Sequence, residues 1–451
     1  MVSSIPLWRQ LQAAASVLAA VRAGRSATDA LVAVDGALRP GVQALVFQAL
    51  RQLGQAEALR RQLARRAPPP EADALLCLAL ALAWNPQDAP YEVFTLVNQA
   101  VDAAKRQPST QAQSGFVNAC LRRFLRERDA LVAATASDPV AQWNHPRWWI
   151  DRLRRDHPQR WQDILRASNL PAPMTLRVNA RQATPAQYRQ TLAEAGITAT
   201  PIGAHGLVLD QGRPVHELPG FDTGMVSVQD AAAQQAAPLL LAGLQAPPGE
   251  RLRVLDACAA PGGKTAHLLE LAGPDGADVT ALDVDAQRCE RIHQNLQRIG
   301  LAARVAVGDA ASPGAWWDGQ LFDAILLDAP CTASGIVRRH RDVRWLRRET
   351  DIAQLAATQA RLLAALWPLL KPGGRLLYCT CSVFRAEGDA QVQAFVAHNT
   401  GAVLLPSPGH LMPQSGANAN PVPDNLEGDH DGFFYALLQK LPAPGPVQAT
   451  A

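Results

Sequence analysis

Three cysteines stand at the ends of two apolar runs in the C-terminal half of the chain. Cys331 lies in "LLDAPCTASG" (326–335), whereas Cys379 and Cys381 lie in "LLYCTCSV" (376–383). A cysteine in such a place is most often a small buried hydrophobe. A zinc site needs four ligands at suitable spacing, and C-x-C without a second C-x-x-C or H-x₃-H pair does not supply them. We therefore expect no metal site, which leaves packing and nucleophilic catalysis as the alternatives.

Position in the predicted sheet favours catalysis for two of the three thiols. Cys331 and Cys381 both follow apolar strands, and open α/β folds bind their ligands at the carboxyl ends of the strands. Asp328 lies three residues before Cys331, in the same turn. A thiolate beside an acid in one crevice is suited to covalent catalysis. Cys379 has no role in this interpretation and is assigned to packing.

A glycine turn lies upstream of these cysteines. The stretch "RLRVLDACAAPGGKTAHLLELAG" (251–273) predicts a strand, a turn and a helix. Gly263, Lys264 and Thr265 fit the end of a phosphate-binding P-loop. However, Cys258 stands where the P-loop has its first glycine, and the G-x-G-x-x-G of a dinucleotide site is absent. The loop therefore suits a ligand with a small charged group and no phosphates.

Three acids close three successive predicted strands. Asp256 ends the strand before the glycine turn, and Asp283 and Asp309 end the next two. An acid in this position is often only the N-cap of the following helix. Three such acids facing one crevice favour a ligand instead, with Asp283 placed to hold ribose hydroxyls and Asp309 to meet a purine edge. The ligand that we infer is S-adenosylmethionine.

The elements that must position these residues fall into three parts. The 451 residues are enough for two or three domains. Residues 1–140 have apolar residues at i, i+3, i+4 spacing and predict an all-α domain. Residues 141–235 predict a small α+β module. Strands and helices alternate in residues 236–440, which predicts a parallel sheet covered by helices, and residues 441–451 are expected to form a flexible tail.

Bulk properties exclude several classes of protein. The opening "MVSSIPLWRQLQ" lacks a signal-peptide pattern. The apolar run "LLCLALALAW" (75–84) is shorter than the roughly 18 residues of a membrane span. The seven cysteines have no regular spacing, so we expect no disulfides and a reducing compartment. The sequence thus predicts a cytoplasmic protein without a membrane partner, and we expect it to be a monomer.

Several motifs together resemble a known family. "DACAAPGGKT" (256–265), "LLDAPCTASG" and "YCTCSV" are similar to the motifs of RNA 5-methylcytosine methyltransferases of the NOL1/NOP2/Sun family. "LVNQAVDAAKR" (96–106) and "SGFVNACLRRFLRER" (114–128) resemble a NusB-like helical domain. "LPGFDTGMVSVQDAAAQ" (218–234) is similar to the stretch that leads into the catalytic domain. The resemblance implies a NusB-like N-terminal domain, a small α+β module and a Rossmann-like domain that uses S-adenosylmethionine.

The resemblance also implies roles for Cys331, Cys381 and Asp328. Carbon 5 of cytosine is a poor nucleophile, and a thiolate that adds at carbon 6 divides one hard step into easier ones. Cys381 resembles that nucleophile, and Cys331 resembles the thiol that assists its release. Asp328 is expected to hydrogen-bond N3 and the exocyclic amine of the base. The cofactor contacts that we expect are Cys258, Ala259, Ala260, Pro261, Gly262, Gly263, Lys264, Asp283, Asp309 and Asp328.

Charge after the Cys331 motif indicates an RNA contact. "IVRRHRDVRWLRRE" (336–349) concentrates arginines around a tryptophan. Such a run is usually a solvated helix face. Its position beside a catalytic motif favours RNA instead, since arginine clamps phosphates and stacks on bases. The candidate RNA-binding residues are Arg338, Arg339, Arg341 and Arg344.

Two classes of function are compatible with these patterns. The first is an enzyme that methylates a cytosine of 16S rRNA, by the family resemblance cytosine 967, with a tRNA or another rRNA cytosine as the alternative target. The second is a non-catalytic NusB-like RNA-binding or antitermination factor. A binding factor has no need of Cys331, Cys381 and Asp328, so the sequence favours the enzyme.

Overall fold

The computed structural model describes residues 5–87, 89–413 and 428–442, so most of the expected tail at 441–451 lies outside the described residues. The chain forms two compact units. The first contains the residues up to Asn169 together with Val337–Glu349, and the second contains Leu170–Ile336 and the chain from Thr350 onward. Residues 141–169 are thus grouped with the helical part, whereas the sequence placed a boundary near 140. In the described part of the chain no helix is long and apolar enough to span a membrane.

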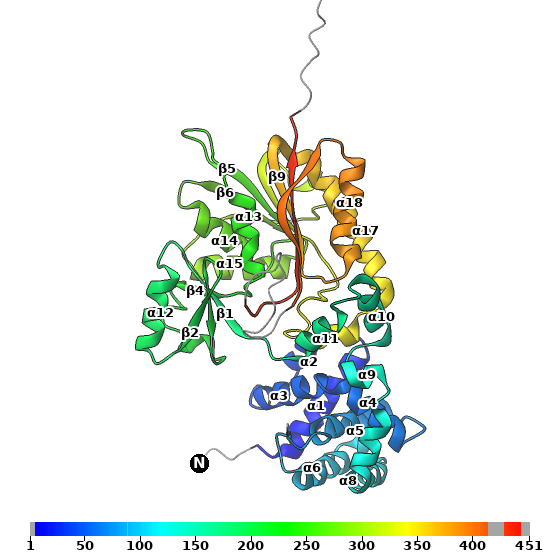
Figure 1. The fold of residues 1–451 in the computed structure, drawn as a ribbon. Helices are drawn as coiled ribbons and strands as arrows, with labels where there is room; N and C mark the ends of the chain where they lie inside the picture. Colours follow the sequence, from blue (N-terminus) through cyan, green and yellow to red (C-terminus); the bar gives the residue numbers. More distant parts are fainter. Residues whose placement is uncertain (1–4, 88, 414–427, 443–451) are drawn as a thin grey trace, which may run out of the picture. The chain divides into compact units, whose positions relative to one another are not determined.

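The first unit is all helical, which confirms the prediction for this part of the chain (Figure 1). Helix α5 is its centre, because every residue from Ala72 to Ala83 is buried. A helix that is apolar all round must be surrounded by others, and α1, α3, α4 and α6 pack against it. The helices of this unit are α1 (Leu7–Arg22), α2 (Ala27–Val32), α3 (Arg39–Leu50), α4 (Leu53–Leu63), α5 (Pro70–Ala83), α6 (Val93–Arg106), α7 (Pro108–Gln111), α8 (Ser114–Thr135), α9 (Pro139–Trp143), α10 (Arg147–Asp156), α11 (Trp161–Asn169) and α16 (Val343–Leu346).

Residues 337–349 are an integral part of this helical unit. The Asp342 carboxylate accepts a hydrogen bond from the backbone N–H of Ala27 at 2.8 Å, near the start of α2. Arg344 is buried, and its guanidinium donates to the carbonyl oxygens of Asn144 at 3.2 Å and Ser168 at 2.6 Å. Buried donors and acceptors must be paired, so this segment holds the ends of α9 and α11 in place.

The second unit begins with a small α+β module, as predicted. Its four-stranded sheet has the order β2-β3-β1-β4, and neighbouring strands are antiparallel. Helix α12 (Pro185–Glu194) starts at a capping box, in which the Thr184 hydroxyl accepts from the backbone N–H of Gln187. The strands are β1 (Met174–Val178), β2 (Ala199–Ile202), β3 (Gly206–Leu209) and β4 (Val226–Val228).

A seven-stranded, mostly parallel sheet forms the rest of the second unit. Its order is β10-β11-β9-β8-β5-β6-β7. Strand β11 runs antiparallel to both of its neighbours, β10 and β9, and the other neighbouring strands are parallel. The strands are β5 (Leu252–Ala257), β6 (Ala277–Asp283), β7 (Arg304–Val307), β8 (Phe322–Asp328), β9 (Leu370–Thr380), β10 (Ala402–Leu411) and β11 (Phe433–Lys440). This topology confirms the Rossmann-like prediction.

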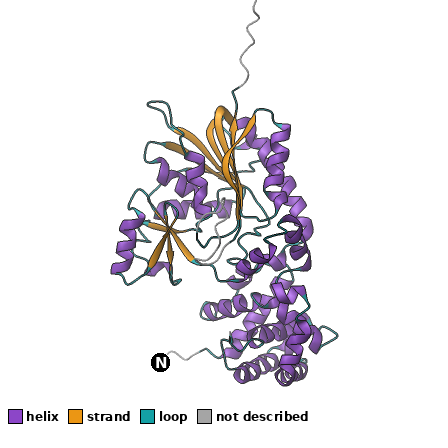
Figure 2. Ribbon diagram, in the orientation of Figure 1, coloured by secondary structure: helices purple, strands orange, loops and turns teal. Residues whose placement is uncertain are grey.

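Helices cover both faces of the large sheet (Figure 2). Along β8, Leu326 belongs to the core beneath one set of helices and Leu327 to the core beneath the other, because successive side chains of a strand face opposite sides. The helices are α13 (Ala236–Leu241), α14 (Gly263–Ala272), α15 (Ala286–Arg298), α17 (Glu349–Leu366) and α18 (Asp389–His398). From β5 the chain moves to β6 and β7 on one side and later to β8 and β9 on the other. Ligands of open α/β sheets bind at the carboxyl ends of the strands beside such a switch point.

Candidate active site

A hollow of about 380 Å³ lies at this switch point, at the carboxyl ends of β5, β6 and β8. Its size is within the range of small-ligand sites. Several residues that the sequence singled out line it together: Cys258, Ala260, Asp283, Asp309, Asp328, Cys331 and Cys381. Ala259, Pro261, Gly262, Gly263 and Lys264 belong to the adjoining turn and do not line this hollow.

The turn between β5 and α14 is held from helix α15. Gly262 has φ of +95° and stands just before α14, a backbone conformation that favours glycine. The Arg288 guanidinium donates to the Ala260 carbonyl oxygen at 2.9 Å, and the Asn295 side-chain amide donates to that of Pro261 at 2.7 Å. These contacts hold the turn beside the hollow through its carbonyl oxygens.

Asp283 connects that turn to β6. Its carboxylate accepts from the backbone N–H of Ala260 at 3.0 Å and forms an ion pair with Arg288 at 3.5 Å. Asp309, at the end of the next strand, accepts from the backbone N–H of Ala311 at 2.8 Å. Each carboxylate oxygen has two lone pairs, so both acids keep acceptor capacity toward the hollow.

Asp256 does not line the hollow. We expected it there with Asp283 and Asp309, as the three acids that end β5, β6 and β7, and this prediction is wrong for Asp256. It is fully buried inside the fold, where it accepts a hydrogen bond from the Thr265 hydroxyl at 2.6 Å. Burial raises the pKa of Asp256 to about 7. Its contact with Thr265 anchors the first turns of α14, and Asp328 at the end of β8 is the third acid of the hollow.

The two candidate catalytic sulfurs are in contact. Cys331 Sγ and Cys381 Sγ lie 3.3 Å apart, and Cys331 is buried whereas Cys381 is half-buried. The hydrogen bond to Cys381 and burial together raise the pKa of Cys331 well above its ordinary value. Cys331 is therefore protonated at neutral pH.

Within the described residues no cluster of His, Cys, Asp or Glu has the arrangement to hold a metal ion.

Asp328 lies between a lysine and the third cysteine. Lys264 Nζ is 2.6 Å from one Asp328 oxygen, and the Cys379 thiol donates to the other at 3.5 Å. Burial opposes the charge on Lys264, but Asp328 outweighs it, and the pKa of Lys264 is raised above its ordinary value. Cys379 is fully buried, as the packing interpretation requires, and it also orients Asp328.

Sequence reasoning missed a buried glutamate that connects the two cysteine loops. Glu387 accepts hydrogen bonds from the Thr332 backbone N–H at 2.9 Å and the Ser382 hydroxyl at 2.6 Å. Thr332 follows Cys331, and Ser382 follows Cys381. One carboxylate therefore ties both thiol-bearing loops together. An acid six residues after Cys381 has no local pattern that would have marked it.

A second missed group joins the α+β module to the glycine turn. The fully buried Arg177 of β1 pairs with Glu270 of α14 through two hydrogen bonds, at 2.7 and 2.9 Å. The same guanidinium donates to the Gly263 carbonyl oxygen at 2.9 Å. Removing one partner of a buried ion pair is costly, so this contact fixes the start of α14 relative to the module.

The four candidate RNA-binding arginines have different environments. Arg338 and Arg344 each expose 1% of their surface. The carbonyl contacts of Arg344 occupy its guanidinium, so we correct its interpretation as a phosphate clamp to a structural role. Arg339 and Arg341 are half-buried. The segment belongs to the helical unit because these internal contacts outweigh its nearness in sequence to Cys331.

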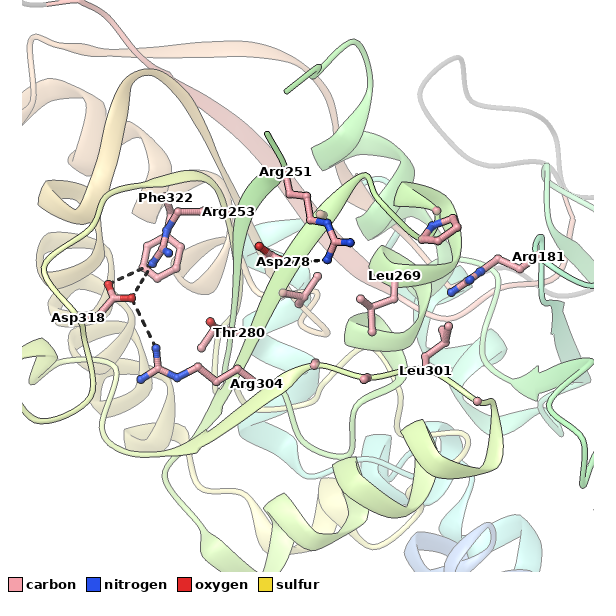
Figure 3. A pocket seen from close by; sticks show the side chains of 17 residues that line it. Arg181, Arg251, Arg253, Leu269, Asp278, Thr280, Leu301, Arg304, Asp318 and Phe322 are labelled. Atoms are coloured by element: carbon pink, nitrogen blue, oxygen red, sulfur yellow. Dashed lines mark hydrogen bonds and ion pairs between the residues drawn. The ribbon is translucent and has the colours of Figure 1, made fainter. Parts of the chain in front are cut away.

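A larger hollow, of about 520 Å³, lies at the opposite ends of the strands (Figure 3). Arginines at the starts of β5 and β7 reach into it, and Asp318 pairs with Arg253 at 2.9 Å and with Arg304 at 3.6 Å. Arg251 pairs with Asp278 at 3.2 Å. These ion pairs neutralise Arg251, Arg253 and Arg304. The residues that line this hollow include no cysteine, and the chemistry proposed below does not use it.

The fold and the site define a Rossmann-like methyltransferase with an added helical domain. Residues 243–439 match the family described as 16S rRNA methyltransferase RsmB/F. Residues 145–216 match the ferredoxin-like domain of RsmF/B-like methyltransferases, and residues 9–126 match the NusB family.

Known proteins resemble the chain over nearly its whole length. The ribosomal RNA small subunit methyltransferase B of Vibrio cholerae is 40% identical, covering 95% of this chain and 96% of the relative. The ribosomal RNA small subunit methyltransferase B of Pseudomonas syringae is 39% identical, covering 96% of this chain and 97% of the relative. The crystal structure of a methyltransferase homolog protein from Pyrococcus horikoshii is 29% identical, covers 67% of this chain and 98% of that one, and has a TM-score of 0.53. The chain belongs to the RsmB/F family of methyltransferases.

Proposed function

We propose that this protein transfers a methyl group from S-adenosylmethionine to carbon 5 of a cytosine in 16S rRNA. The observation that carries the proposal is the pair of sulfurs 3.3 Å apart, in the same hollow as Asp283, Asp309 and Asp328. The names of the relatives, which are small-subunit rRNA methyltransferases, support the choice of RNA.

The hollow fits the cofactor by the chemistry of its walls. Asp283 and Asp309 supply acceptors for ribose hydroxyls and for the amine of a purine, and Leu282 and Leu362 supply apolar surface for the base. The turn from Cys258 to Lys264 borders the hollow and holds the rest of the cofactor. When bound there, S-adenosylmethionine supplies an electrophilic methyl group.

Cys381 is the nucleophile in this proposal. Cys381 is the less buried residue of the pair and is therefore the more accessible to a base, so we assign to its sulfur the bond to carbon 6 of the cytosine. The electron pair of the former C5–C6 double bond then makes carbon 5 a nucleophile for the methyl group. Lys264 stays close to this chemistry because its ammonium is held by Asp328 at 2.6 Å.

Asp328 and Cys331 serve the base and the release step. Asp328 lines the hollow, held by Lys264 and Cys379, and is placed to hydrogen-bond N3 and the exocyclic amine of the cytosine. After methyl transfer, a base takes the proton from carbon 5 and the electrons of that C–H bond form the C5–C6 double bond again. The bond between carbon 6 and Cys381 breaks with its electron pair on the sulfur, which restores the aromatic ring. Cys331 assists this release from 3.3 Å away.

The target that we propose is cytosine 967 of 16S rRNA, methylated by a monomer in the cytoplasm. Bisulfite sequencing of total RNA from a deletion strain, complemented with the wild type or with Cys381→Ala, tests it. One rRNA cytosine that resists bisulfite conversion should lose this protection on deletion. Only the wild-type gene should restore it. Loss of protection at a tRNA cytosine or another rRNA cytosine would replace this target. No change at any cytosine would refute the enzyme and favour an RNA-binding factor.

A further inference from the structure

The helical unit contains a third hollow, of about 660 Å³, beside helix α3. Phe47, Gln48 and Arg51 line it from α3 or the residue after it, Tyr91 lines it from the turn before α6, and Arg341 lines it from the 337–349 segment. The hollow therefore joins cationic, amide and aromatic groups from three separate stretches of the chain. No part of the proposed chemistry uses it.

Both arginines of this hollow are half-buried. Arg51 donates to the Gln48 side-chain oxygen at 3.2 Å, and neither guanidinium forms an ion pair with a carboxylate in the described part of the chain. The Nε atoms of Arg51 and Arg341 are both buried without an acceptor. Elsewhere in this unit the half-buried arginines Arg22 and Arg60 share the carboxylate of Asp73.

The charges of the two arginines also repel one another. Burial, and next the nearby charge of Arg51, lower the pKa of Arg341 to about 10, so both side chains remain cations at neutral pH. Two partly desolvated cations held together without a counterion are best stabilised by an anion. A guanidinium donates to phosphate oxygens in a fixed, planar geometry.

The remaining walls suit a nucleobase rather than a bare anion. The guanidinium of Arg341 lies over the ring of Phe47, with its central carbon 5.1 Å from the ring centroid. A base stacks on aromatic rings and on guanidinium planes. Gln48 adds an amide, which is able to hydrogen-bond a base edge.

We propose that this hollow binds one nucleotide of single-stranded RNA, with its phosphate between Arg51 and Arg341 and its base against the aromatic side chains. The inference rests on the proposed function in taking RNA as the substrate, and it adds a contact for a nucleotide other than the target cytosine. An acidic protein ligand is the competing occupant.

Fluorescence anisotropy of the full chain with a labelled 20-nucleotide single-stranded RNA tests this proposal. The double variant Arg51→Gln/Arg341→Gln should bind the RNA at least about tenfold more weakly at 100 mM KCl, as expected for the loss of charge-assisted hydrogen bonds. The slope of log affinity against log salt should fall in magnitude by about 0.7, as expected for one lost phosphate contact on single strands. The variant Arg65→Gln/Arg66→Gln removes the same charge from exposed positions of this unit and is the control.

A second variant keeps both arginines, because removal of Arg341 also removes its packing on Phe47. Gln48→Glu places a carboxylate beside Arg51 and should also weaken RNA binding, whereas the exposed Gln62→Glu should not. If both test variants bind the RNA like their controls, the proposal is wrong and an acidic protein ligand becomes the better candidate. Binding is measured without methyl transfer, so absence of 5-methylcytosine would refute the proposed function and leave this result unaffected.

Discussion

Cys331 and Cys381 are 50 positions apart in the chain, and their sulfurs lie 3.3 Å from each other. Register explains the proximity, because β8 and β9 are parallel neighbours in which Asp328 pairs with Cys379. The residues just beyond each strand then meet at the carboxyl edge of the sheet. Beyond the strands, the Gly335 N–H donates to the Cys381 carbonyl oxygen at 2.9 Å and holds the two loops together.

The two sulfurs should be separable by mutation. Cys381→Ala should abolish methyl transfer and leave no covalent RNA complex, because only the attacking sulfur carries the bond. Cys331→Ala should still attack and methylate, then stall before release, and the protein–RNA adduct should survive denaturing gel electrophoresis. Cys120→Ala, in the helical unit, is the control and should behave like the wild type. An adduct trapped by Cys381→Ala and not by Cys331→Ala would reverse the roles.

Asp283 should account for part of the cofactor affinity. Replacing it by alanine removes the expected ribose contact and should weaken S-adenosylmethionine binding by about 1.5–3 kcal/mol, the usual contribution of a hydrogen bond to a charged group. Titration calorimetry measures this directly. Asp278→Ala, at the other end of β6, removes an exposed acid from the same strand and should leave the affinity unchanged. Equal affinities for the two variants would contradict the assignment.

Local sequence patterns predicted the strand ends, the glycine turn and the thiols, because periodicity and turn chemistry are short-range properties. They failed for Asp256, since a strand residue and the residue just beyond its end look alike in sequence. The structure is needed to show that Asp256 accepts a hydrogen bond from Thr265 inside the fold. The prediction that Arg344 binds RNA failed for a related reason. The carbonyl groups that it contacts, those of Asn144 and Ser168, are far away in the sequence.

Glu387 shows the other limit of sequence reasoning. An acid in a loop is normally solvated, and nothing local reveals that this one is fully buried among hydroxyl donors. Its neighbours come from the Cys331 loop, from α17 and from the Cys381 loop. A long-range network of this kind has no spacing signature, so the sequence indicates the candidate catalytic residues without the group that connects their loops.

Buried Asp256 should make stability depend on pH. Its pKa is about 7 in the folded protein and 3.8 as an ordinary carboxyl. Between about pH 4 and 7 the folded state therefore keeps a proton that the unfolded state has lost, and the free energy of unfolding falls as pH rises through that window. At about 1.4 kcal/mol per pKa unit the loss is at most about 4 kcal/mol.

Asp256→Asn should remove this dependence. The amide oxygen still accepts from Thr265, so the variant should gain stability relative to the wild type between pH 4.5 and pH 8. Urea denaturation of both proteins at the two pH values measures the difference in unfolding free energy. Asp278→Asn, at the one exposed position of β6, should show no such gain. Parallel pH profiles of Asp256→Asn and the wild type would mean that Asp256 is not the titrating group.

Glu387 should act on catalysis as a positioning residue. Glu387→Ala removes the acceptor of the buried Thr332 N–H, which costs about 1–3 kcal/mol, and also removes the link to the Ser382 hydroxyl, which loosens both cysteine loops. Because a displacement of about 1 Å costs roughly 100-fold in rate, kcat should fall by about 10- to 100-fold. KM for S-adenosylmethionine should stay close to the wild-type value, since Glu387 does not line the hollow.

A conservative variant separates positioning from general loss of structure. Glu387→Gln keeps one oxygen acceptor, and the hydroxyls of Thr332 and Ser382 are able to rotate and accept from its amide, so it should recover much of the lost kcat. Single-turnover methyl transfer and thermal unfolding should be measured for both variants, with the exposed Glu250→Ala as the control. If Glu387→Ala unfolds at the wild-type temperature and keeps full kcat, or loses activity only through a raised KM, the carboxylate does not hold the two thiols in register.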